Sequence, residues 1–577
     1  MKWSGIVVGS VLALGLAVGL PIALGSLPAP VDLTAYLSTP RPYMLLEGPR
    51  ASIPEVSVGP SSVARRVDVR EWPAGLGPGL HLRTWHIDYG HRWEREVTLP
   101  LLVGPFDREG TDVCGLAVRL GAGLFDTSKA GAGIKAIVHR EIARNFPFQF
   151  SDEETGIELR FPEVQETDFR IFLRQGGVDV LIGISLEDGT VFGATVPLRL
   201  VARDGSPVLE RMGTVQTRWT GATRDELLKQ AAEKGADAGG GLGALGGLVL
   251  LGPAGLLVGA GIGSGIGAEE GREKANRVAN KRVEEEITRR LDKALDRLAL
   301  GMEHFREPWS PLSRRPHDQV RLRLARDPIV SPDSIILPLC TSITVAPPKV
   351  DAAVPGSARV ASPATVDVEA LGGEGATIQL MADANAINQI LYLLWQSGTL
   401  RELGQSSAVL DALPEQLRTL AFDVTGFDPG LPPTAMLVSR GMPERDGLSV
   451  LLGDVALGTW GDRRVVGPAS TVVRIREIDH TLELSALLHD VTVNCVAPGG
   501  NAGTSLTPCL SDLLPIVREM VSEKPLVRRL SGSDLLGRLP ELTFQGIKLE
   551  VSKLSASVTS GPPRVNVQVD ARILAQP

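Results

Sequence analysis

The sequence predicts an α+β protein made of two tandem units, and three observations support this prediction. Several stretches alternate apolar and polar residues, which is the pattern of antiparallel strands with one buried face. Other stretches repeat apolar residues every three or four positions, as amphipathic helices do. A segment rich in Pro and Ala, residues 346–364, separates the two sets and predicts a linker.

Composition supports a globular chain and argues against one class of partner. The 577 residues are 43% hydrophobic and 22% charged, which is the balance of an ordinary folded protein. The formal net charge is −8, and Lys and Arg are interspersed with Asp and Glu rather than gathered in a stripe. Because binding to a phosphate backbone needs such a basic stripe, nucleic acid is excluded as an expected partner.

The N-terminus predicts export. Residues 5–24 are apolar and uncharged, one Lys precedes them, and small residues follow. Residues 1–25 are therefore either a cleaved signal peptide or a retained anchor, in which residues 5–24 cross the inner membrane. Both alternatives place the remaining chain in the periplasm or cell envelope. Residues 26–78 are rich in Pro and predict an irregular lead-in.

The first predicted unit covers residues 79–345. Residues 134–146 have the spacing of an amphipathic helix that Pro147 ends, and residues 169–200 alternate as a meander with a turn at Asp188-Gly189. A long amphipathic helix is predicted after residue 268, with these apolar positions on one face: Val283, Ile287, Leu291, Ala294, Leu295 and Leu298.

The second predicted unit covers residues 365–577. A strand leads through Asp383, a predicted N-cap, into an apolar helix that Gly398 ends. Strands rich in Val and Leu follow, then a second amphipathic helix over residues 509–522, then two alternating strands. Cys495 and Cys509 flank a loop that can fold back, so a disulfide between them is predicted. Cys114 and Cys340 lie in apolar strands and are interpreted as small buried hydrophobic side chains.

Residues 238–268 contain no charge and 13 glycines, in the middle of an otherwise water-soluble chain. Gly252-Pro253 divides the segment into halves of about 20 Å, and a bilayer core is about 30 Å thick, so neither half spans it alone. Rows of Gly at every fourth position let two helices approach closely. We therefore predict a glycine-rich helical hairpin that contacts a membrane through Gly239, Gly243, Gly247, Leu250, Leu251, Gly255, Gly259, Gly263 and Gly267. The alternatives are a hairpin packed on the protein's own sheet and insertion as an oligomeric pore.

No motif predicts catalysis. The sequence contains no nucleophile elbow, phosphate-binding loop or dinucleotide fingerprint in the required context. His81, His86 and His91 form the only His cluster, and their spacing matches no common metal site. We therefore expect no enzyme activity, no cofactor and no metal.

Residues 377–403 combine a strand, a short break, an Asn-containing apolar helix, a Gly and a Leu-rich continuation. This order resembles the carboxy-terminal domain of the family of bactericidal/permeability-increasing and lipopolysaccharide-binding proteins. The segments at residues 413–420, 430–442 and 535–558 are similar in order. The first half, around residues 307–312, resembles a related and uncharacterised bacterial family.

The resemblance implies two tandem tubular lipid-binding domains. In each domain a curved antiparallel sheet wraps around a long amphipathic helix and encloses an apolar tunnel for acyl chains, and the glycine-rich hairpin is inserted in the first domain. The lipid-binding side chains would be Ile387, Leu391, Leu394, Trp395, Leu510, Leu513, Val517 and Val521. The sequence departs from the family in two respects: the close Cys pair lies in the second unit, and no cationic tip marks a lipopolysaccharide site.

The expected function is therefore non-catalytic binding or transfer of lipids in a bacterial cell envelope. The expected partners are lipids and a membrane surface, with envelope proteins or further copies of this chain as additional candidates. Two alternatives from other classes stay open: a membrane-inserting or pore-forming protein that uses the glycine-rich hairpin, and a structural envelope protein without a ligand.

Overall fold

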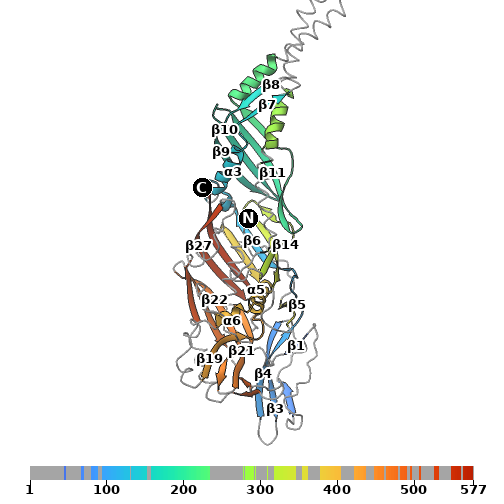
Figure 1. Ribbon diagram of the computed structural model, residues 1–577, viewed down its shortest axis with the longest axis vertical. Helices are drawn as coiled ribbons and strands as arrows, with labels where there is room; N and C mark the ends of the chain where they lie inside the picture. The colour runs from blue at the N-terminus through green and yellow to red at the C-terminus, as the bar shows by residue number, and fades with distance from the viewer. Residues whose placement is uncertain are drawn as a thin grey trace, which may run out of the picture.

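The structure is a computed structural model, shown in Figure 1. It describes residues 44–46, 66–69, 79–88, 94–129, 132–152, 157–233, 277–278, 280–290, 293, 308, 318–345, 354–360, 377–404, 422–436, 448–460, 463–478, 481–489, 494–496, 506–508, 526–531, 547–560 and 563–575. The described residues lie mostly in strands, with few helices, so the predicted α+β class is confirmed.

The molecule is elongated, and its sheets follow one another along the long axis (Figure 1). A sheet-and-helix unit, here called the upper unit, occupies the top of the view, and a central sheet lies below it. A second unit, the lower unit, follows and is flanked at the bottom by a small sheet of N-terminal strands.

The central sheet has seven strands and is antiparallel throughout. In spatial order its strands are β14 (Gln319–Leu324), β16 (Ser334–Thr344), β6 (Val113–Gly121), β18 (Ile378–Asp383), β28 (Pro563–Ala575) and β27 (Ile547–Ser560). β15 (Ile329–Ser331) pairs with β16 on the edge that β14 also occupies.

The pairing of β6 with β18 joins the two halves of the chain. Leu120 lies opposite Ile378 and Leu116 opposite Ala382, in an unbroken antiparallel register. The sequence predicts a linker over residues 346–364, and part of it is packed: β17 (Ser357–Ala358) pairs with β5 (Phe106–Asp107), and Val354 is buried. The described central sheet therefore takes strands from both sides of this segment.

The upper unit is the predicted meander. Its sheet contains β9 (Val164–Arg174), β10 (Gly177–Leu186), β11 (Val191–Arg203), β12 (Ser206–Arg211) and β13 (Gln216–Thr220). Burial alternates along β10 and β11, as the period-two pattern predicts. Gly176 and Gly189 have positive φ at the two hairpin turns, a backbone conformation that glycine adopts without steric cost. The turn at Asp188-Gly189 is confirmed.

Helical segments cover the apolar face of this sheet. The predicted helix is confirmed as α3 (Ala132–Ala143), which buries Ile137, Val138 and Ile142. Residues 222–233 and 280–290 are also helical, and Val283 and Ile287 are buried as the sequence predicts. A short 3-10 helix, η1 (Ala122–Phe125), links β6 to this region, and β7 (Phe148–Asp152) and β8 (Ile157–Phe161) form a hairpin at the upper end.

Aromatic rings fill the interior beside this hairpin. Phe148 stacks on Phe161 with ring centroids 4.5 Å apart, and Phe192 stacks on Trp219 at 5.4 Å. The Arg290 guanidinium lies 3.7 Å above the centre of the Phe148 ring. This cation–π contact attaches the segment 280–290 to the hairpin.

In the part of the chain that the structure describes, the lower unit contains an eight-stranded sheet and two helices. The strands are β19 (Phe422–Pro429), β20 (Thr434–Met436), β21 (Leu448–Trp460), β22 (Arg463–Ile478), β23 (Thr481–His489), β24 (Asn494–Val496), β25 (Leu506–Pro508) and β26 (Leu526–Ser531). The helices are α5 (Ala384–Gln396) and α6 (Thr399–Gly404). The small sheet contains β1 (Met44–Leu46), β2 (Arg66–Val69), β3 (Gly79–Asp88) and β4 (Glu94–Val103).

The cysteines of the central sheet correct one interpretation. Cys114 on β6 and Cys340 on β16 form a disulfide, so reading them as unlinked hydrophobic side chains was wrong. The two strands are neighbours, which no local pattern reveals because 226 residues separate the cysteines. The predicted Cys495–Cys509 bond stays a prediction: β24 places Cys495 opposite Thr507, and Cys509 lies outside the described residues.

Asp188 fixes the start of the helical residues 222–233. Its carboxylate accepts hydrogen bonds from the Thr190 amide (3.0 Å), the Thr190 hydroxyl (2.9 Å) and the Thr223 hydroxyl (2.5 Å). Partial burial raises the pKa of this carboxyl, but the hydrogen bonds from Thr223 and Thr190 outweigh burial, and the pKa lies below its ordinary value.

We expect Asp188→Ala to lower the free energy of unfolding by about 1–3 kcal/mol, because it removes three hydrogen bonds to a charged group. The pKa of Asp188 is lower in the folded state, so its contribution is complete above pH 3.8 and is lost as the pH falls through the folded value. Urea unfolding measured from pH 7 to pH 2 checks both statements. Asp168→Ala is the control, because Asp168 forms only an exposed ion pair with Arg170 and should cost about 0–1 kcal/mol.

Candidate functional site

Helix α5 contains four of the side chains for which the sequence predicts lipid binding. Asp383 caps it, because its side chain accepts a hydrogen bond of 2.9 Å from the Ala386 amide. Gly398, with φ of 74°, follows its C-terminal end, so both predicted helix signals are confirmed. Every residue of α5 is buried. The helix packs against β6, β16 and β18 of the central sheet on one side and against β17 and β20 on the other.

Four of the predicted lipid-binding residues lie on this helix. Ile387, Leu391, Leu394 and Trp395 are each at most 2% exposed and belong to one contiguous apolar cluster. The Trp395 indole N–H donates to the Pro429 carbonyl at 2.8 Å, which fixes the ring. The structure therefore brings these four side chains together inside the protein. The other four, Leu510, Leu513, Val517 and Val521, lie outside the described residues.

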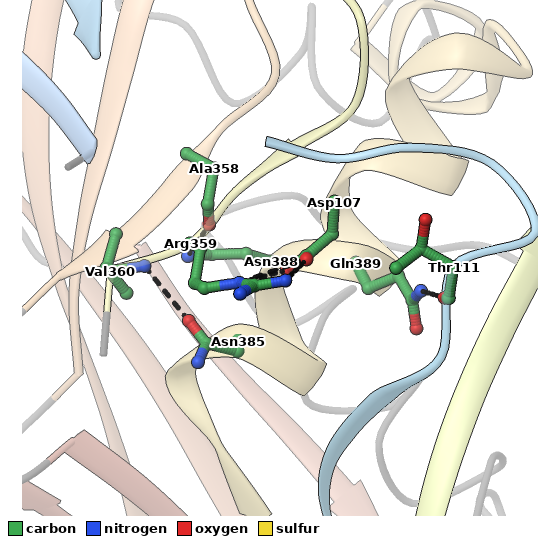
Figure 2. Close-up of polar contacts among 8 residues, drawn as sticks. All are labelled: Asp107, Thr111, Ala358, Arg359, Val360, Asn385, Asn388 and Gln389. Carbon is green, nitrogen blue, oxygen red and sulfur yellow. Dashed lines mark hydrogen bonds and ion pairs between the residues drawn. The ribbon is translucent and has the colours of Figure 1, made fainter. Parts of the chain in front are cut away.

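The polar side chains of α5 bind backbone groups of three other segments, and Figure 2 shows those at residues 358–360 and at Thr111. The Asn388 amide donates to the carbonyls of Ala358 (3.3 Å) and Ala435 (3.2 Å), and its oxygen accepts from the Ala435 amide at 2.6 Å. Asn385 accepts a hydrogen bond of 2.9 Å from the Val360 amide. These contacts tie the helix to β20 and to residues 358–360.

Gln389 makes a third connection, to the central sheet. Its amide donates to the Thr111 carbonyl at 3.1 Å, and its oxygen accepts a short hydrogen bond from the Thr341 hydroxyl on β16. Gln389 is fully buried, so both partners are needed to offset the cost of removing its amide from water.

An ion pair anchors the segment that crosses the helix. The Arg359 guanidinium donates to the buried Asp107 carboxylate, with Nε 3.0 Å from Oδ1 (Figure 2). This hydrogen bond raises the pKa of Arg359, and the negative charge of Asp107 adds to the increase. Residues 354–360 are therefore attached to β5 by charge and to α5 by amide contacts.

Tyr392 completes the polar side of the helix. Burial and, to a smaller extent, the nearby charge of Glu109 raise the pKa of its phenol to about 12. Burial also raises the pKa of Glu109. The phenol is therefore neutral at physiological pH and donates to the Val354 carbonyl at 3.3 Å.

The surroundings of α5 offer apolar surface and the hydrogen-bonded amides of Asn385, Asn388 and Gln389. Among the described residues, no group of three or more His, Cys, Asp or Glu side chains could hold a metal ion. His81 and His86 of the sequence cluster lie on β3, and His91 is outside the described part of the chain. The role of Asn385, Asn388 and Gln389 was not predicted, although four side-chain amides on an otherwise apolar helix, these three and Gln396, were a visible signal.

The predicted glycine-rich hairpin, from Gly239 through Leu250 and Leu251 to Gly267, lies outside the described residues. Its two flanks are described, and both attach to the β7–β8 hairpin. Gln230 exchanges hydrogen bonds with the backbone amide (3.1 Å) and carbonyl (3.0 Å) of Glu158. Arg282 forms an ion pair with Asp152. Asp152 lies opposite Ile157 in the hairpin, so the two attachment points are adjacent.

No protein-family model matches this sequence, and no curated protein sequence matches it significantly. Among solved structures, the crystal structure of lipopolysaccharide binding protein is similar at 13% identity and a TM-score of 0.28, covering 79% of this chain and 98% of that chain. P47 from Clostridium botulinum A2 is similar at 10% identity and a TM-score of 0.30, covering 80% and 98%. P47 of Clostridium botulinum E1 is similar at 10% identity and a TM-score of 0.27, covering 81% and 100%. Lipopolysaccharide binding protein is one of the proteins that the sequence at residues 377–403 resembles.

We expect Gln389→Leu to lower the free energy of unfolding by about 1–3 kcal/mol, because the Thr111 carbonyl and the Thr341 hydroxyl then lose a buried partner. Gln165→Leu, the same substitution at an exposed position on β9, should change it by less than about 0.5 kcal/mol. Urea unfolding followed by tryptophan fluorescence measures both. Equal effects of the two substitutions would contradict the assigned role of Gln389.

Proposed function

We propose that this protein binds lipids, or transfers them, in a bacterial cell envelope, without catalysing a reaction. One observation carries the proposal: the apolar interior is continuous along the molecule. A single cluster of buried apolar residues joins the upper unit, the central sheet, α5, the lower unit and β3, represented by Trp219, Val118, Leu394, Val450 and Leu80.

Such an interior suits an acyl chain for a simple energetic reason. Each CH₂ group that leaves water for apolar surroundings gains about 0.8 kcal/mol, so a long chain supplies its own binding free energy without polar contacts. The α5 side chains Ile387, Leu391, Leu394 and Trp395 line this interior where the central and lower sheets meet. The apolar N-terminal residues 5–24, which predict export, and the sequence resemblance at residues 377–403 support the same function.

A second function, contact of the glycine-rich segment with a membrane, rests on a separate observation. The helical residues 222–233 and 280–290 are attached to adjacent positions of one hairpin at the upper end of the molecule. Both flanks therefore lie at one end of the fold, and a single crossing that placed them on opposite sides of a bilayer would break these contacts. No helix among the described residues is long and apolar enough to cross a membrane.

Lipid binding predicts that the full chain, purified without detergent, carries phospholipid or fatty acid that native mass spectrometry detects. It should also extract a fluorescent phospholipid from vesicles. Leu391→Gln should weaken extraction at least about tenfold, because it places an amide in the apolar interior. Leu209→Gln, the same substitution at a half-exposed position on β12, should leave extraction unchanged. Repeated preparations without lipid, and no extraction, would favour a structural protein with a solid core.

Membrane contact predicts a different result for deletion of residues 239–267. The shortened chain should lose vesicle co-sedimentation and any dye release, because the uncharged segment is removed, and it should retain the lipid that co-purifies with the interior. Co-sedimentation and dye release from phosphatidylglycerol-containing vesicles measure the first effect, and native mass spectrometry measures the second. Undiminished vesicle binding after the deletion would rule out this contact.

A further inference from the structure

The disulfide of the central sheet lies at an irregular position between two strands. The register of β6 and β16 is regular up to Leu116 opposite Leu339 and then shifts before Val113 and Thr341 meet. Cys114 and Cys340 stand within this shift. A shift of this kind interrupts the ladder of backbone hydrogen bonds, so the covalent bond holds the strands together where the ladder is weakest.

One end of this disulfide is accessible and the other is not. Cys114 is exposed, whereas Cys340 is buried. A dissolved thiol can therefore approach Cys114, and its attack there expels Cys340 as the leaving group.

The residues next to the disulfide hold α5 in place. Thr341, adjacent to Cys340, donates its hydroxyl to Gln389. Gly115, adjacent to Cys114, packs so closely on the helix cap that a Cβ there would lie 1.9 Å from Asp383 Oδ1. Thr111, three residues before Cys114, accepts the other hydrogen bond of Gln389. Residues at this irregular position therefore contact both the N-cap of α5, Asp383, and its buried amide, Gln389.

We propose that the Cys114–Cys340 disulfide is a redox-sensitive clamp on α5. With the bond intact, β6 and β16 keep the register in which Gly115 packs on Asp383 and Gln389 binds Thr111 and Thr341. With the bond reduced, the strands separate at the shift, Gln389 loses its two partners together, and α5 loosens from the central sheet. The clamp is a property of the fold; its consequence for ligands, that reduction opens the interior beneath α5 to lipid, rests on the proposed function.

The chemistry is ordinary thiol–disulfide exchange with a dithiol. One thiolate of the dithiol attacks Cys114 Sγ, the S–S bond breaks, and Cys340 leaves as a thiolate that takes up a proton. The second thiolate of the dithiol then attacks the mixed disulfide and releases Cys114. The protein gains two electrons and two protons, and the dithiol is oxidised to its cyclic disulfide.

The test uses the full chain carrying Cys495→Ser and Cys509→Ser, in which Cys114 and Cys340 are the only cysteines. Hydrogen exchange of the α5 amides is compared before and after reduction with dithiothreitol, and mass spectrometry of the alkylated protein confirms that both thiols formed. We expect exchange in α5 to accelerate by about tenfold or more on reduction and to return on reoxidation, because local opening free energies govern these rates. The variant Cys114→Ser with Cys340→Ser is the matched control, and dithiothreitol should not change its α5 exchange.

Four other outcomes decide the matter. Unchanged α5 exchange after complete reduction would overturn the clamp. Equal acceleration in β10 and β11 of the upper sheet would also overturn it, because the bond would then affect only global stability. Uptake of a fluorescent phospholipid, measured on the same samples, tests the consequence: measurable uptake that is equal before and after reduction contradicts control of access. Accelerated α5 exchange with no uptake in either state supports the clamp and counts against the proposed function.

Discussion

The pairing of β6 with β18 is the interaction on which the rest of the structure depends. It joins strands from the two halves of the chain through five consecutive residue pairs, from Leu120 opposite Ile378 to Leu116 opposite Ala382. Because α5 follows β18 directly, this pairing also determines where the helix begins. The side chains of Leu116, Val118 and Leu380 turn to the common apolar cluster, so one ladder aligns the sheet, the helix and the interior.

Local chemistry explains which parts of this arrangement the sequence could predict. The meander of the upper unit, α3, the cap of α5 at Asp383 and its end at Gly398 are confirmed, because each depends on residues close together in the chain. The Cys114–Cys340 bond and the β6–β18 pair could not be predicted, because both depend on contacts between distant residues that no periodicity records. The candidate site divides in the same way: the apolar face of α5 was evident, whereas the partners of Asn388 and Gln389 lie on four other segments.

These amide contacts give the interior a defined arrangement rather than a large stabilisation. A satisfied hydrogen bond adds only about 0.5–1.5 kcal/mol, but a buried amide without its partners costs more, so alternative positions of α5 are penalised. The Arg359–Asp107 ion pair also penalises movement of residues 354–360, because separating it would leave the buried Asp107 carboxylate without its counter-charge. Apolar burial supplies most of the stability, and the amides determine one orientation of the helix.

Complete burial of α5 has a direct consequence for any ligand of the interior. Every position of the helix is covered by protein, so an acyl chain that reaches Leu391 or Leu394 must enter through a rearrangement of the surrounding segments. Residues 354–360 and β20 cover one side of the helix and are held there by a few polar contacts. On the other side, β6 and β16 are joined by the disulfide. An acyl chain could enter only if hydrogen bonds of Asn385, Asn388 or Gln389 were broken, and because a buried amide without its partners is costly, these contacts oppose entry.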